Sequence, residues 1–85
     1  MTPKSRTDPF LQDSFSRLNA RFFGNALEQP NLVWGQDSFR KLASYNFHSD
    51  TITVSSLFRD APPEMLDYLL YHEMLHQNFK FRHRN

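Results

Sequence analysis

The 85-residue sequence predicts a single α+β domain: an N-terminal helix, a small sheet of three mainly antiparallel strands and a C-terminal helix. Apolar residues recur with helical spacing near both ends of the chain. Between them, short segments rich in β-branched and aromatic residues indicate strands. The length allows one domain. We expect residues 1–7 to form a flexible arm and residues 8–85 to form the domain.

The first helix has a start signal, an apolar stripe and a stop signal. Thr7 or Asp8 can cap it, and Pro9 suits its first turn because a proline there gives up no helical hydrogen bond. Gly24 and Asn25 are typical of a helix end. The stripe that we expect to face the core consists of Leu11, Phe15, Leu18 and Phe22.

Three strands are expected in the middle of the chain. Residues 32–34 read as a short strand that ends at Gly35. Residues 42–48 and 51–55 flank a tight turn at 49–50 and therefore predict a β-hairpin. Alternation along the second of these strands predicts that Ile52 and Val54 share one face of the sheet.

The last helix is expected from about residue 60 to residue 81, with nothing to break it between them. Its apolar residues cover most of the circumference, and His72 and His76 fall among them. Only a narrow strip that includes Asp67 and Met74 is left over. Because a helix that is apolar nearly all round is normally buried, we expect it to lie between the first helix and the sheet.

Composition excludes several classes of protein. The chain has no Cys, so any metal must be held by His and carboxylate side chains. The net charge of +1 excludes a strongly basic protein. No apolar run approaches the ~20 residues of a membrane span, and the N-terminus lacks the apolar segment of a signal peptide. We therefore expect an intracellular, cytoplasmic protein without membrane contact.

The segment His72-Glu73-Met74-Leu75-His76 matches HExxH. Four residues are about one helical turn, so both imidazoles can hold one Zn²⁺ ion, and Glu73 can accept a proton from a zinc-bound water that attacks a peptide bond. Chance alone gives this pattern in fewer than about one such sequence in a hundred. The structural alternative, a pair of core histidines, requires polar partners for both rings.

The sequence resembles the SprT-like (Spartan-type) zinc metallopeptidase domain over about residues 10–79. The resemblance is carried by FxRLNARFFGN, NLVW, LASYNF, TITVSSLF and LLYHEMLHQNF. HExxH is its most specific part and is shared by other zincins, including the small minigluzincins. The resemblance implies a zincin-like fold, zinc-dependent proteolysis of polypeptide substrates, zinc ligands at His72 and His76, and a general base at Glu73. Some members of the family cleave proteins crosslinked to DNA.

A third protein ligand is expected for catalytic zinc. SprT-like proteins use a downstream His and minigluzincins a Glu on a following helix, and the chain stops before either. On a continued helix His83 would stand ~10 Å beyond His76 along the axis, and His48 would reach the site only through tertiary packing. The chain could be C-terminally incomplete, a remnant, or completed by a second molecule. We expect the 85 residues alone to be inactive or weakly active.

The alternative function is a non-catalytic module that binds nucleic acid or protein. Cations and aromatic residues mix near the C-terminus as they do on single-strand binding surfaces, although a solvated tail past the end of the helix explains them better. Tyr45 and Asn46 could also line a groove for an extended peptide. The sequence does not indicate the oligomeric state. The C-terminal residues in question are Phe79, Lys80, Phe81, Arg82 and Arg84.

Overall fold

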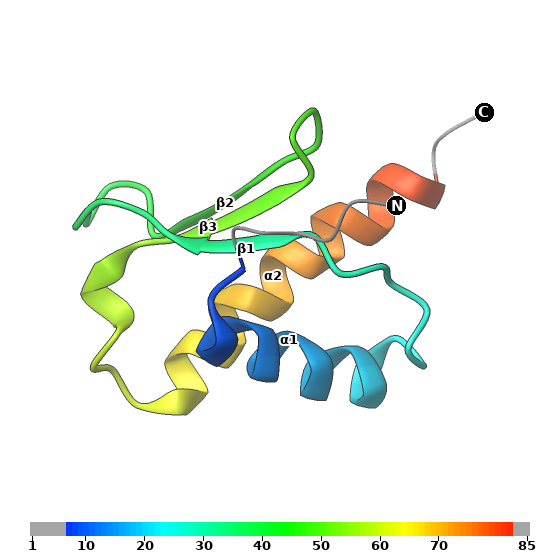
Figure 1. The fold of residues 1–85 in the computed structure, drawn as a ribbon, viewed down its shortest axis with the longest axis horizontal. Coiled ribbons are helices and arrows are strands. Elements are labelled where there is room, and N and C mark those ends of the chain that lie inside the picture. Colours follow the sequence, from blue (N-terminus) through cyan, green and yellow to red (C-terminus); the bar gives the residue numbers. More distant parts are fainter. Residues whose placement is uncertain (1–6, 83–85) are drawn as a thin grey trace.

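The computed structural model describes residues 7–82, with side chains from residue 7 to residue 79. It confirms the α+β class. Helices α1 and α2 form one layer, and the three-stranded sheet lies across it (Figure 1). Most of the predicted arm, residues 1–6, lies outside the described residues. In chain order the elements are α1 (Pro9–Phe22), β1 (Asn31–Trp34), β2 (Ala43–Asn46), β3 (Thr51–Val54), the 3-10 helix η1 (Ser56–Phe58) and α2 (Pro63–Arg82).

Helix α1 begins and ends as its sequence predicts. The Asp8 carboxylate accepts hydrogen bonds from the backbone N–H groups of Phe10 and Leu11, which pairs donors that a helix start leaves without partners. Gly24 and Asn25 follow the helix in left-handed conformation, with φ of 60° and 62°. The predicted stripe faces the core except at its end, where the half-exposed Phe22 packs on Tyr71 of α2 instead.

The sheet is mixed, with strand order β1-β3-β2. Strand β3 pairs antiparallel with β2, as the predicted hairpin requires, and parallel with β1. Its central position buries Ile52 and Val54 completely. Leu32 on β1 is completely buried as well. In the described part of the chain, strand β2 pairs only with β3 and therefore forms one edge of the sheet. This edge strand also contacts α2.

The burial of α2 differs from the sequence expectation. The fully or almost fully buried residues are Leu66, Leu70, Met74 and Gln77, whereas His72 and His76 are exposed. Helix α2 does contact both α1 and the sheet, as expected, but its outer face is exposed and not buried between two layers. Both helices share one layer, so no described element covers the outer face of α2. Met74, expected in the exposed strip, belongs to the core.

Two side-chain clamps hold the loop between α1 and β1. The amide of Asn19 donates to the carbonyl of Leu27 at 2.9 Å and accepts from its N–H at 3.2 Å. Nε2 of the buried Gln77 donates to the carbonyl of Glu28 at 2.7 Å. Residues on both helices therefore fix this loop, and Gln77 follows His76 directly. No helix in residues 7–82 is long and apolar enough to cross a membrane.

Candidate active site

The two histidines of the motif stand on adjacent turns of α2, and both are exposed. Their ring centres are 5.0 Å apart, with the rings nearly perpendicular at 80°. Two imidazoles that bind one tetrahedral zinc ion at about 2.0–2.1 Å have ring centres roughly 5 Å apart. His72 and His76 therefore already have the spacing of a shared metal ion. Because both rings are exposed, water can pair with their nitrogens and no buried polar partner is needed.

Glu73 lies in a different environment from its neighbours. Its side chain is only 7% exposed, and it lines a groove of about 410 Å³ between β2 and α2 together with His76. One metal-ligand candidate and the candidate base thus border the same space. The other residues lining the groove are Ala43, Ser44, Tyr45, Phe47 and Phe79.

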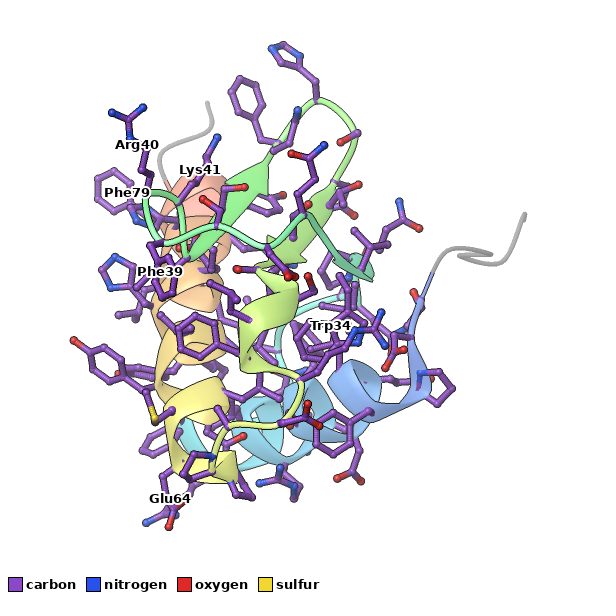
Figure 2. The ribbon with its side chains drawn as sticks, turned by 90° about the vertical axis from the view of Figure 1, so that its left-hand side faces the viewer. Trp34, Phe39, Arg40, Lys41, Glu64 and Phe79 are labelled. Atoms are coloured by element: carbon purple, nitrogen blue, oxygen red, sulfur yellow. The ribbon has the colours of Figure 1, made fainter. Side chains whose placement is uncertain are left out.

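The aromatic walls of this groove come from both elements. Tyr45 belongs to β2, and Phe47 belongs to the turn after it. Figure 2 shows Phe79 projecting outward from the C-terminal part of α2. Tyr45 thus lines the groove as the sequence suggested, whereas Asn46 instead accepts hydrogen bonds from the N–H groups of His48 and Ser49. Sequence reasoning missed Phe47, although strand alternation from Ala43 through Tyr45 would have placed it on the same face.

The hydroxyl of Tyr45 is engaged in a hydrogen bond with a neighbouring carboxylate. It donates to Oδ1 of Asp50 at 2.9 Å. Burial raises the pKa of Tyr45, and the hydrogen bond and the negative charge of Asp50 raise it further. Tyr45 therefore stays protonated at neutral pH and serves as a neutral wall of the groove.

The third metal ligand is not found among residues 7–82, which contain no group of three or more His, Cys, Asp or Glu side chains able to hold one ion. His48 lies in the turn between β2 and β3, where its ring stacks on Phe47 with centres 4.2 Å apart. The structure does not bring it to the histidine pair. His83 lies outside the described residues, as do Arg84 and the side chains of residues 80–82, so the basic cluster is not described either.

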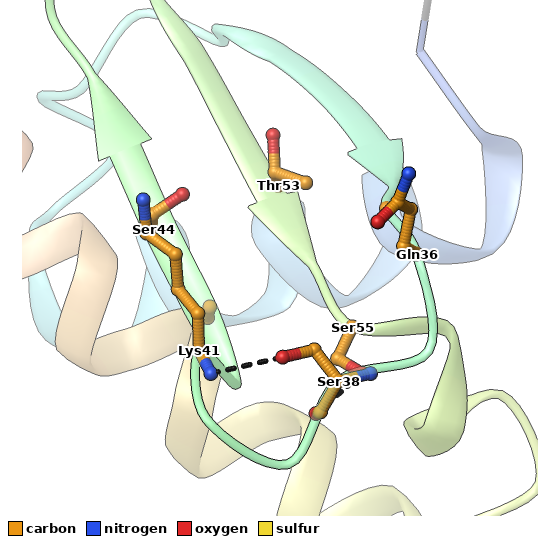
Figure 3. A pocket seen from close by; sticks show the side chains of 8 residues that line it. Gln36, Ser38, Lys41, Ser44, Thr53 and Ser55 are labelled. Atoms are coloured by element: carbon orange, nitrogen blue, oxygen red, sulfur yellow. Dashed lines mark hydrogen bonds between the residues drawn. The ribbon is translucent and has the colours of Figure 1, made fainter.

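A second pocket of about 220 Å³ opens near β2 and β3 and the link before β2 (Figure 3). Its lining includes Lys41 and several hydroxyl groups but no carboxylate or imidazole. Within it, the Ser55 hydroxyl accepts from the N–H of Ser38 and donates to the carbonyl of the same residue. These hydroxyls hold the link in place, and the pocket is separate from the motif.

Comparison with known proteins places the fold. No family model and no curated protein matches the chain. Among solved structures it is similar to the crystal structure of the metallopeptidase zymogen of Methanocaldococcus jannaschii jannalysin, with a TM-score of 0.67, 21% identity, and coverage of 94% of this chain and 69% of that chain.

The chain has a metallopeptidase-like fold. This supports the zincin-like architecture that the HExxH helix predicted. At 21% identity the similarity shows the fold alone, so it does not single out the SprT-like family among zincins.

Proposed function

We propose that this chain is a zinc-dependent metallopeptidase domain, in which His72 and His76 bind the metal and Glu73 is the general base. One observation carries the proposal: Glu73 and His76 line the same groove as the edge strand β2. A base, a metal ligand and a strand edge able to pair with an extended peptide therefore border one space. The metallopeptidase-like fold supports this assignment.

The donor set fits zinc. Imidazole is a common zinc ligand, and the separation of the two rings suits a shared tetrahedral ion. When bound, zinc supplies Lewis-acid polarisation of a peptide carbonyl and of a water molecule. The described residues provide two of the three protein ligands that catalytic zinc usually has. We therefore expect a single copy of the chain to bind zinc weakly and to hydrolyse peptides slowly.

The chain's own residues define the remaining steps. An extended polypeptide adds to the outer edge of β2 through backbone hydrogen bonds, which aligns it along the groove. Phe47 and Phe79 contact its side chains and reduce access of bulk water. Glu73 accepts a proton from the attacking water and passes it to the leaving amine, which completes cleavage of the C–N bond. The support for this step is that Glu73 lines the groove, along which the peptide lies in this proposal.

The test compares zinc binding and hydrolysis in the same variants. We expect Glu73→Gln to bind zinc as the parent chain does, measured by calorimetry, and to lose cleavage of an unfolded polypeptide carrying a quenched fluorophore. Glu64→Gln is the matched control, because Glu64 is exposed in the first turn of α2. His72→Ala should lose zinc binding and cleavage together. Full activity in Glu73→Gln would remove the general-base assignment.

A further inference from the structure

The exposed face of α2 has the spacing of a helix-pairing seam. Five exposed residues on it follow one another at intervals of three, four, three and four positions, the a/d pattern of coiled coils. Four are large and apolar, and each is 41–70% exposed. We call this set the α2 seam: Met65, Tyr68, His72, Leu75 and Phe79.

One histidine of the pair belongs to this seam, and the other stands beside it. His72 is one of its five positions, and His76 stands one turn further along the same side. Zinc sites with only protein ligands are almost always four-coordinate, and no third ligand accompanies the pair in the part of the chain that the structure describes. The described surface therefore carries half of a closed zinc site, set in an apolar helix face.

We propose that one Zn²⁺ ion bridges two copies of this chain through α2, with His72 and His76 of each copy completing a tetrahedral site of four imidazoles. A two-fold axis through the metal, perpendicular to both helices, makes them antiparallel. Tyr68 of one copy then lies opposite Phe79 of the other. The inference rests on the metal-binding part of the proposed function and is independent of Glu73.

A second copy fits this face because the pattern is self-complementary. In a two-fold interface the same patch is used twice, and two ligands from each side supply the four that zinc requires. Five side chains along one helix bury roughly a few hundred Å² per chain, well below the ~800 Å² per partner of standard stable interfaces. The apolar contacts alone are therefore too few, and we expect association to depend on the metal.

The bridged state has a consequence for activity. Four imidazoles leave zinc no open position for water, and catalytic zinc sites need one. Phe79 belongs both to the α2 seam and to the groove beside Glu73, so a second copy also covers part of the substrate path. The zinc-bridged dimer is thus an inhibited form, whose population depends on the ratio of zinc to protein.

The test is sedimentation velocity on the whole chain with one zinc ion per two chains. We expect the mass of two 10.1 kDa chains, reversal by excess EDTA, and a monomer for His76→Ala. The matched control His48→Ala removes a histidine from the β2–β3 turn and should dimerise normally. Leu75→Glu should fold normally, as measured by circular dichroism, because Leu75 is exposed. It should sediment as a monomer and bind zinc only weakly.

The outcomes separate this inference from the proposed function. A monomer that binds one zinc ion per chain overturns the bridge and leaves the peptidase site standing. Absence of zinc binding in the parent chain overturns both. A dimer that persists in EDTA and in His76→Ala overturns zinc as the bridging group. Glu73→Gln should dimerise like the parent chain, since its carboxylate takes no part in the bridge.

Discussion

The hydroxyl of Tyr45 donates a 2.9 Å hydrogen bond to Oδ1 of Asp50, joining the edge strand β2 to the last residue of the turn before β3. Asp50 has a positive φ of 51°, a conformation that costs energy for residues other than glycine. The contact therefore stabilises a strained turn directly beside the candidate groove. Because β2 forms one wall of that groove, the same bond helps to fix the wall.

The first prediction concerns Tyr45→Phe and its pH dependence. Burial, followed by the interaction with Asp50, raises the pKa of Tyr45 in the folded chain above the ~10 of an unfolded tyrosine. The folded state therefore keeps the proton to higher pH. The stabilisation is fully present below about pH 10 and is lost as pH rises through the folded-state pKa. Between about pH 10 and 12, urea unfolding should show a steeper loss of stability in the parent chain than in Tyr45→Phe.

At neutral pH the same substitution should cost about 1 kcal/mol, the net contribution of one hydrogen bond. Tyr68→Phe is the control, since Tyr68 is 70% exposed. At neutral pH, Tyr68→Phe should unfold with the same free energy as the parent chain. Equal slopes for Tyr45→Phe and the parent chain would show that folding does not raise the pKa of Tyr45.

The second prediction concerns the loop clamp at Asn19. Asn19→Ala leaves the N–H and the carbonyl of Leu27 without their side-chain partner in a buried position. Each such group costs about 1–3 kcal/mol, so we expect the two together to lower the free energy of unfolding by roughly 2–6 kcal/mol. Chemical denaturation measures it, with Gln12→Ala, exposed on the same helix, as the control. A loss no larger than that of the control would mean that the loop rearranges to satisfy both groups.

The third prediction separates stability from activity at Glu73. This carboxylate is 7% exposed, and no Lys or Arg of the described residues forms an ion pair with it. Burying an ionised carboxylate costs free energy, and functional sites often retain such costs. We expect the metal-free Glu73→Gln chain to be as stable as the parent or up to about 1 kcal/mol more stable. A clear loss of stability in thermal unfolding would indicate that Glu73 has a structural role.

Local patterns predicted the elements well, because caps and periodicity act within a few residues. Asp8 and Pro9 mark the start of α1, and the alternation of Ile52 and Val54 identifies the core face of β3. The pairing of β1 with β3 was not predictable in this way, since it joins strands twenty residues apart in register. No local signal distinguishes that arrangement from an antiparallel meander.

The buried face of α2 could not be chosen from periodicity, because apolar residues surround most of the helix. The core took Leu66, Leu70 and Met74, and the apolar residues beside His72 remained exposed. That outcome depends on how many layers the chain can form, which is a tertiary property. The pair of metal-ligand candidates was readable from the four-residue spacing alone, whereas the groove beside it required the packing of β2 against α2.

The fourth prediction is that zinc stabilises the folded chain through the histidine pair. A ligand that binds only the folded state adds about 2.7 kcal/mol at one hundred times its dissociation constant. Because the rings of His72 and His76 already stand 5.0 Å apart, binding requires little rearrangement of α2. Thermal unfolding should therefore shift upward with added zinc and return with EDTA. His72→Ala should lose the shift while keeping the metal-free midpoint, since His72 is exposed, and His48→Ala should keep both. An equal zinc-induced shift in His72→Ala would place the metal elsewhere on the chain.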